Sequence, residues 1–372
     1  MRTKMFALVA VGVVTLGVTA ACTDDNGETG AAGTSTRTGS GSGKVGVILP
    51  DTTSSQRWGT DDPKFLKAAF DAAEVPLDIQ NAQGDKAKFA QIADGMIASG
   101  VKVLMTANLD PQVGRDVLKK AKAAGIKTND YDRLTLNGGA DYYVSFDNVK
   151  VGQLQAQGLI KCLNQRDAEL PVVANLNGSP TDNNATLFQR GYDGELQKKY
   201  DDGSFLKGPD QSVAEWDNKE AKTVFTEMWR LTDKKISGVL AANDGLGNSV
   251  INVLRKNNLN GKVPVTGQDA TVQGLQNILA GDQCMTVYKP IKLEADAAAK
   301  LAIQLFKGET PKLRADEQVK DPESGSIIPA KLLVPIAIDK KSVNTVITGG
   351  FVEKKAVCTG RFAALCRSNG IK

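Results

Sequence analysis

Histidine is absent from the 372 residues, and this absence removes several kinds of site at once. Without histidine the chain has no Ser-His-Asp or Cys-His hydrolytic arrangement and no His-ligated zinc. Charge of one sign is also lacking, because 46 Lys and Arg face 42 Asp and Glu, whereas a nucleic-acid binder normally concentrates basic residues on one face. Nothing in the composition calls for a cofactor, a metal ion or a nucleic acid. Chemistry based on carboxylates or lysine stays open.

A long apolar run is missing as well. The uncharged stretch 5–21 contains glycine and falls short of the about 20 apolar residues of a membrane span. Arg2 and Lys4 give a short positive stretch directly before these uncharged residues. The segment 1–21 is therefore predicted to be an export signal. The small residues before Cys22 resemble a bacterial lipoprotein signal, in which Cys22 becomes the lipidated first residue; the alternative is an ordinary signal peptide cut near Ala21.

Residues 22–43 are dominated by Gly, Thr, Ser and Ala without apolar periodicity, which predicts a flexible tether. A tether behind a lipidated Cys22 would hold a folded body near a membrane surface. The expected location is therefore outside the cell, with the lipid anchored in the outer face of the cytoplasmic membrane.

Export also decides how the cysteines are interpreted. If Cys22 carries lipid, four cysteines remain, an even number that favours two disulfides among three possible connectivities. Cys358 and Cys366 lie eight residues apart and are expected to pair locally, which leaves Cys162 and Cys284 for a long-range bridge. The alternative is that one or more are free, buried thiols.

Short β-rich runs alternate with helical segments from residue 44 onward, which predicts βαβ units and parallel sheets in two α/β lobes. Strands are expected at 45–49, 101–106, 126–130, 172–176, 238–242, 263–266, 285–288 and 331–338. Helices are expected at 63–74, 86–99, 112–124, 149–163, 185–200, 219–231, 247–257, 272–280 and 293–307. Asp62 before Pro63 is predicted to cap the first of these helices.

Ligands of open α/β sheets bind beyond the carboxyl ends of the strands, so the polar residues that follow the predicted strands form the candidate site. Six strand ends carry such residues: Arg57 and Trp58; Asp132 and Arg133; Asp182, Asn183 and Asn184; Asn243 and Asp244; Gln268 and Asp269; and Lys289. Carboxylates, amides, arginine and lysine can satisfy the vicinal hydroxyls of a sugar in pairs, and the apolar face of a pyranose packs on an aromatic ring.

Each of these residues also has an ordinary structural interpretation. Asn183 and Asn243 are good helix caps, and Asp132 with Arg133 can form a local salt bridge. Trp216 is a further candidate for ligand contact, with burial in the core as the alternative. Trp229, at helical spacing from a phenylalanine, is predicted to lie in the core.

Several short stretches together identify a family. They are Arg57-Trp58, Tyr131-Asp132-Arg133, residues 143–148, residues 178–185, Asn243-Asp244, residues 267–270 and residues 285–290. In combination they closely resemble the bacterial D-xylose-binding proteins, the periplasmic-type sugar-binding components of ABC transporters, over roughly residues 44 to 351.

The resemblance implies two doubly wound parallel-sheet lobes joined by three hinge strands, the type I periplasmic binding protein fold. The first lobe would comprise 44–147 and 290–326, the second 148–289 and 327–348, and a cysteine-containing tail 349–372 would lie outside the pattern. Hinge crossings are expected near 146–149, 288–291 and 324–329.

The family's ligand-contacting positions carry over onto Arg57, Trp58, Asp132, Arg133, Asn183, Trp216, Asn243, Asp244, Asp269 and Lys289. Arg190, displaced by one residue from the arginine that the family uses, is a further candidate.

The expected function is a non-enzymatic, monomeric receptor. It would capture D-xylose or a close monosaccharide by lobe closure and deliver it to an ABC permease. One alternative is an exported carbohydrate-active enzyme, in which Asp132, Asp244 and Asp269 supply an acid–base pair. Another is a sugar sensor that feeds a signalling receptor.

Overall fold

A computed structural model describes residues 43–371 of the chain. The predicted export signal, the predicted lipidation site Cys22 and nearly all of the predicted tether lie outside the described residues. Among residues 43–371, no helix is both long and apolar enough to cross a membrane.

A seven-stranded sheet organises the first lobe. Strand β1 (Val45–Leu49), buried along its whole length, pairs in parallel with two neighbours, and all contacts in the sheet are parallel except that of the edge strand β10. The strands lie in the order β10 (Gln318–Lys320), β11 (Ile327–Leu333), β5 (Tyr142–Phe146), β4 (Lys127–Tyr131), β3 (Val103–Thr106), β1 and β2 (Leu77–Asn81).

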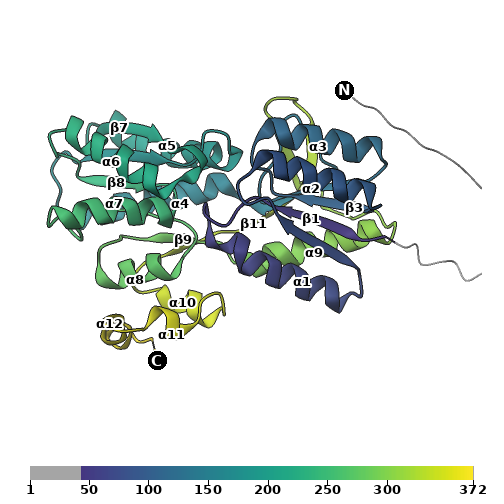
Figure 1. The fold of residues 1–372 in the computed structure, drawn as a ribbon. Helices are drawn as coiled ribbons and strands as arrows, with labels where there is room; N and C mark the ends of the chain where they lie inside the picture. Colours follow the sequence, from purple (N-terminus) through teal and green to yellow (C-terminus); the bar gives the residue numbers. More distant parts are fainter. Residues whose placement is uncertain (1–42, 372) are drawn as a thin grey trace, which may run out of the picture. The chain divides into compact units, whose positions relative to one another are not determined.

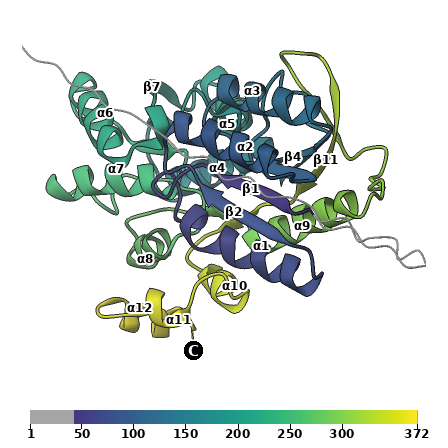
Figure 2. The same ribbon diagram turned by 45° about the vertical axis from the view of Figure 1, so that its right-hand side comes forward.

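Helices cover both faces of this sheet. Helices α1 (Asp61–Ala72) and α9 (Ile291–Phe306) share one apolar cluster with the strands, and α2 (Lys86–Ala98) and α3 (Pro111–Ala123) build a second cluster (Figures 1 and 2). The clusters are separate because successive side chains of a buried strand point to opposite faces, as Val47 and Ile48 do. The first lobe is therefore doubly wound, as predicted.

The second lobe is built around the parallel strands β7 (Leu206–Ser212), β6 (Val172–Asn177) and β8 (Gly238–Ala241), with an antiparallel pair β9 (Thr286–Tyr288) and β12 (Ile336–Ile338). Two helix pairs pack on these strands, α4 (Asn148–Asn164) with α5 (Asn183–Asp201) and α6 (Asn218–Leu231) with α7 (Asp244–Lys256). The strand predicted at 263–266 is wrong: only Val265 forms a bridge, because Pro264 has no N–H to extend the ladder.

Three segments connect the lobes. Strand β5 leads into α4 and β9 leads into α9, so these two crossings lie at the end of β5 and the end of β9. The third crossing is later than the sequence suggested. Residues 327–333 pair with β5 in the first lobe, and the chain reaches β9 of the second lobe only at Ile336. The predicted run 331–338 is thus divided between two sheets.

The C-terminal segment packs on α8 (Val272–Ala280) of the second lobe. It contains α10 (Val343–Thr348), α11 (Lys354–Val357) and α12 (Phe362–Ser368), and Val357, Cys366 and Ile371 are buried against α8 in a small apolar cluster. Both predicted disulfides are confirmed: Cys358 pairs with Cys366, and Cys162 of α4 pairs with Cys284 before β9. The predicted tail is therefore folded onto the lobe.

Helices α4 and α5 approach each other through two glycines. A Cβ atom on Gly152 would lie 2.0 Å from the backbone oxygen of Phe188, and one on Gly191 would lie 2.1 Å from that of Val149. Both distances are far below van der Waals contact, so the helices can adopt this separation only because neither residue has a side chain.

Replacing Gly191 with alanine should lower the free energy of unfolding by about 1–3 kcal/mol, since α5 must move away from α4. Gly194 on the same helix is the matched control. It is exposed, with open space around it, so Gly194→Ala should stabilise the protein by up to about 1 kcal/mol. Urea unfolding followed by circular dichroism measures both, and equal midpoints for the two variants would contradict the close helix contact.

Candidate functional site

A cavity lies between the lobes, beyond the carboxyl ends of the strands. Side chains of both lobes surround about 330 Å³ of space, counted to its open mouth. Eight of the predicted residues line it: Arg57, Trp58, Asp132, Arg133, Trp216, Asn243, Asp269 and Lys289. Six further lining residues were not predicted as contacts: Ser54, Ser55, Asp182, Asn184, Phe188 and Gln268.

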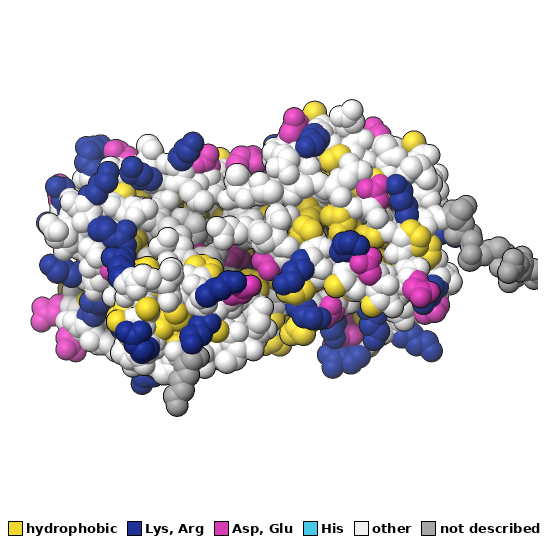
Figure 3. Space-filling view, turned by 60° about the horizontal axis from the view of Figure 1, so that its bottom comes forward, with side chains coloured by type: hydrophobic (Ala, Val, Ile, Leu, Met, Phe, Trp, Pro, Cys, Tyr) yellow, Lys and Arg dark blue, Asp and Glu magenta, His cyan; other side chains and the backbone are white. Residues whose placement is uncertain are grey.

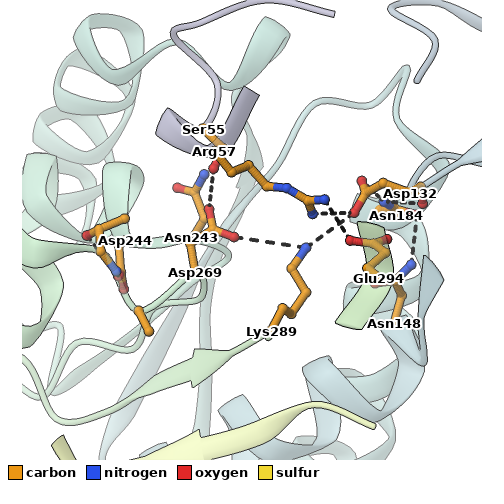
Figure 4. Close-up of polar contacts among 12 residues, drawn as sticks. Ser55, Arg57, Asp132, Asn148, Asn184, Asn243, Asp244, Asp269, Lys289 and Glu294 are labelled. Carbon is orange, nitrogen blue, oxygen red and sulfur yellow. Dashed lines mark hydrogen bonds and ion pairs between the residues drawn. The ribbon is translucent and has the colours of Figure 1, made fainter. Parts of the chain in front are cut away.

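Arg57 is fully surrounded by carboxylates. It lies in a short 3-10 helix (Gln56–Gly59) after β1 and is 4% exposed. Its guanidinium donates to both oxygens of Asp62 at 2.7 and 2.8 Å, to Asp132 at 2.8 Å and to Glu294 at 2.6 Å (Figure 4 shows the contacts to Asp132 and Glu294). The capping role predicted for Asp62 is wrong: α1 begins at Asp61, two residues before the predicted start, and the Asp62 carboxylate is buried against Arg57.

One guanidinium faces three carboxyl groups here, and the pKa values of two of them, Glu294 and Asp132, depart from their usual values in opposite directions. Burial raises the pKa of Glu294 to about 8, against the opposing charge of Arg57. Burial alone would also raise the pKa of Asp132, but Lys289, Arg57 and Arg133 outweigh it and hold that pKa below its usual value. At neutral pH Glu294 is therefore the group that holds a proton, which relieves the excess of negative charge.

Trp58 provides an apolar wall next to these charges. The guanidinium carbon of Arg57 lies 4.2 Å from the centre of its ring, and that of Arg133 lies 5.7 Å away. Arg133 donates to the backbone oxygen of Asn108 at 3.1 Å. Arg133 Nε lies 3.2 Å from Asp182 Oδ2, in an ion pair between the two lobes. Within residues 43–371, Trp58 Nε1 and Gln268 Nε2 are buried donors without a hydrogen-bond partner. The cavity thus presents an aromatic ring together with unused N–H groups.

Trp216 forms the facing wall in the second lobe. Its indole N–H donates to Asp182 Oδ2 at 3.1 Å, and its ring packs edge-on against Phe188 with 6.4 Å between centroids. A Cβ atom on Gly178 would lie 2.0 Å from the Trp216 ring, so that position requires glycine. Trp229, by contrast, packs on Phe225 in the core, as predicted.

Hydrogen bonds cross the cavity between the lobes. Ser55 Oγ donates to Asp269 Oδ2 at 3.0 Å, and Asn243 Nδ2 donates to the backbone oxygen of Ser54 at 3.3 Å. Asn243 also caps α7 through its side-chain oxygen, so it is a helix cap as well as a residue of the cavity wall. Lys289 Nζ lies 3.6 Å from Asp132 and 3.9 Å from Asp269, between acids of opposite lobes (Figure 4).

Asp244 does not line the cavity, which corrects the prediction. It is fully buried behind the loop that carries Asp269, and its carboxylate accepts hydrogen bonds from Thr271, Gln283 and Thr286. Burial raises its pKa to about 7. Asp269 has a φ of 101°, a strained conformation for a residue with a side chain. Asp244 therefore positions that loop, because its hydrogen bonds fix the strand and helix start on either side.

Asn183 and Arg190 also lie outside the cavity. The residue that enters it is Asn184, whose amide donates to Asp132 Oδ1 at 3.0 Å and whose oxygen accepts from Asn148 at 2.8 Å. Asn183 and Arg190 line a different, apolar groove of about 890 Å³. The reason is helical geometry: positions 183 and 190, seven apart, share one face of α5, and Asn184 points about 100° away.

The residues that sequence reasoning missed carry weak signals. Asp182 and Asn184 stood in the identified motif beside Asn183, and the helix phase of α5 was the signal that could have separated them. Glu294 follows the second hinge crossing by a few residues on a helix whose other buried residues are all apolar. Gln268 follows a predicted strand together with Asp269, whereas Ser54 and Ser55 are ordinary loop residues with no distinguishing pattern.

Comparisons with known proteins agree with this arrangement. Residues 45–310 match the sequence profile of the family described as "periplasmic binding protein domain". The D-xylose-binding periplasmic protein of Escherichia coli (strain K12) is 37% identical over 311 residues, covering 83% of this chain and 90% of that protein. The multiple sugar-binding periplasmic receptor ChvE of Rhizobium radiobacter is 33% identical over 322 residues, covering 83% and 90%.

A solved structure has the same fold. The ABC transporter solute binding protein of Clostridium phytofermentans with bound β-D-glucose is 26% identical and superposes with a TM-score of 0.76. The superposition covers 84% of this chain and 99% of that one. The fold predicted from the sequence is thereby confirmed.

Glu294→Gln tests the electrostatics around Arg57. Because burial raises the pKa of Glu294 from 4.5 to about 8, the folded protein keeps a proton that the unfolded chain releases. This group therefore makes the free energy of unfolding fall as the pH rises from about 4.5 to about 8. Glutamine cannot release a proton. In Glu294→Gln the free energy of unfolding should therefore fall less steeply with pH over this range, by a slope that corresponds to at most one proton.

The measurement is the denaturation midpoint as a function of pH. Glu309→Gln, at an exposed position, is the matched control and should leave the wild-type curve unchanged. Some slope will persist in Glu294→Gln, because burial also raises the pKa of Asp130 and Asp244 to about 7. A Glu294→Gln curve parallel to the wild-type curve would contradict the assignment of the proton.

Proposed function

Because this chain belongs to the periplasmic binding protein family, we propose that it is an exported receptor that captures D-xylose or a closely related monosaccharide. The chain is close to sugar-binding transport components, and its relatives include both a D-xylose-binding protein and a protein named for multiple sugars. The same similarity to transport components supports delivery of the captured sugar to an ABC permease. Monosaccharide binding is the claim that the geometry supports best.

The charge balance of the cavity carries the proposal. Its lining contains three cationic side chains, Arg57, Arg133 and Lys289, and three acidic ones, Asp132, Asp182 and Asp269. A charged ligand would bring an additional charge that no lining group is left to compensate, which is costly in a buried place. A polyol is neutral, and its hydroxyls both donate and accept, so it suits a cavity with both kinds of group.

The walls of the cavity suit one sugar ring. Trp58 and Trp216 offer apolar surfaces from opposite lobes for the C–H faces of the ring. The unpartnered N–H group of Gln268 is a donor for a sugar oxygen.

The mechanism is lobe closure around the sugar. A sugar would first contact the polar residues of one lobe. Rotation of the lobes about the three connecting segments would then bring the polar residues of the other lobe against it. In the closed arrangement, hydroxyls of the sugar would compete with the direct contacts between lobes, such as Ser55 to Asp269. Closure excludes water, so a sugar with a wrongly placed hydroxyl would leave a buried partner unsatisfied.

The acids of the cavity are better arranged for holding than for hydrolysis. Asp132 is held by Arg57, lies close to Lys289 and also accepts from Asn184, so its oxygens are already occupied. A general acid needs a pKa near the working pH; the pKa of Asp132 is lowered, whereas burial raises that of Asp269. Asp269 would still need a second carboxylate with free oxygens to complete an acid–base pair, and Asp132 does not offer one. We therefore prefer a receptor to a glycosidase. A lipid anchor at Cys22 would keep such a receptor beside its permease.

Calorimetric titration tests the proposed function. D-xylose, D-ribose, L-arabinose, D-glucose and D-galactose would be titrated into the purified chain, and D-xylose should bind most tightly with one site. Xylose lacks a hydroxymethyl group, so a hexose must fit that extra volume into a small cavity. Absence of heat with all five sugars, from protein shown to be folded, would overturn the proposal.

Asp269→Ala should weaken D-xylose binding by about 1–3 kcal/mol, because it leaves the buried Lys289 and the half-buried Ser55 without this carboxylate. Arg190→Ala is the control. Arg190 is exposed and lines the other groove, so its removal should leave the affinity unchanged. Loss of affinity in Arg190→Ala with none in Asp269→Ala would show that the cavity described above is not the site.

A further inference from the structure

A second and larger cavity adjoins the first one. It encloses about 1060 Å³, counted to its open mouth, between the start of α1, the start of α8 and the C-terminal segment. Figure 3, which brings the side of the C-terminal segment forward, shows a hollow between the two lobes with acidic side chains at its edge. We call this space the vestibule. It shares Ser55, Arg57 and Asp269 with the first cavity.

The partition between the two cavities is thin. At this point the lobes meet through the hydrogen bond from Ser55 Oγ to Asp269 Oδ2 at 3.0 Å. Ser55 stands at the start of the 3-10 helix, and its side chain makes no capping bond there. Its hydroxyl can therefore turn aside at the cost of one hydrogen bond, which a ligand hydroxyl between the two residues can replace.

The outer wall of the vestibule belongs to the C-terminal segment. Phe351 and Ala356 line it, and Phe351 packs on Tyr288 with 5.2 Å between ring centroids. Tyr288 lies directly before Lys289 of the first cavity. The Cys358–Cys366 disulfide and the buried contacts with α8 hold this wall in place. The wall is thus a fixed surface that lies beyond residues 45–310, the part matched by the family profile.

The vestibule combines charged groups with an aromatic surface. Its lining includes the carboxylates of Asp61 and Glu353, the ammonium group of Lys64 and the aromatic ring of Phe351. The hydroxyl of Thr271 is already engaged, because it donates to Asp244 and accepts from the backbone N–H of Gly274. An aromatic surface with charged groups around it is what a second sugar ring needs, for the reasons given for the first.

We propose that the vestibule binds the second unit of a disaccharide, or another glycosidic substituent, whose first unit occupies the inner cavity. The inference rests on the proposed function, because the inner cavity must bind a sugar. It extends the substrate class from free monosaccharides to short pentose saccharides. The partition at Ser55 and Asp269 is the point through which the glycosidic bond passes.

Calorimetry with D-xylose, methyl β-D-xylopyranoside and xylobiose tests the inference. Both glycosides should bind within about tenfold of D-xylose, since the second unit gains contacts and costs one hydrogen bond. Binding of D-xylose with no measurable binding of either glycoside would overturn the inference and leave the proposed function standing. Failure of all three sugars would overturn the proposed function itself, and the inference with it.

Two variants locate the second unit. Phe351→Ala should weaken xylobiose about tenfold and leave D-xylose unchanged, because it removes one aromatic wall. Phe306→Ala, which removes a half-buried ring that lines neither cavity, controls for lost packing. Ala356→Phe should fill the vestibule and also weaken xylobiose alone, so the test survives if Phe351→Ala fails to fold. Equal weakening of both sugars in the folded variants would contradict a second subsite.

Discussion

The buried guanidinium of Arg57 is the interaction on which the rest of the site depends. It joins Asp62 of α1, Asp132 after β4 and Glu294 of α9, which are distant in the sequence. Removing one member of a buried ion pair typically costs about 3–5 kcal/mol, because the partner is left buried and uncompensated. Glu294 arrives only after the chain has built most of the second lobe and returned. The inner wall of the first lobe is therefore complete only when both lobes have been traversed.

Lys289 has a matching role between the lobes. Asp132 belongs to the first lobe and Asp269 to the second, and two carboxylates brought together in a buried cleft would repel each other. Lys289 lies between them, within 4 Å of both. Closure of the lobes is thus compatible with acids on both sides, and those acids can then accept hydroxyl protons from a neutral ligand. The cavity has many charged groups, yet its cations and anions are equal in number.

The sequence predicts those features of the structure that depend on residues close together in the chain, and it fails for features that depend on contacts between distant segments. The alternation of strands and helices and the disulfides were predictable, because local periodicity and cysteine number decide them. Eight site residues were also predictable, since strand ends of parallel sheets converge. The division of residues 331–338 between two lobes was not, because a continuous apolar run says nothing about which sheet it joins.

Side-chain direction was the other limit. Asn183 and Asn184 are chemically identical neighbours, and only the phase of α5 against the rest of the lobe decides which one reaches Asp132. Asp244 follows a strand end, as the predicted ligand-binding residues do, but the loop that carries Asp269 lies between it and the cavity. Asp62 has a local explanation as a helix cap, and only a distant arginine reveals its actual role. These three errors arise from tertiary contacts, which local patterns do not contain.

The most direct test of the account is a crystal structure of residues 43–372 grown with D-xylose. The account predicts one sugar ring in the inner cavity, between Trp58 and Trp216, with hydroxyls bonded to Arg133, Asp269 and other residues of both lobes. It also predicts that the Arg57 ion pairs persist beside the sugar. A sugar bound elsewhere, or held by residues of one lobe in a closed molecule, would contradict it.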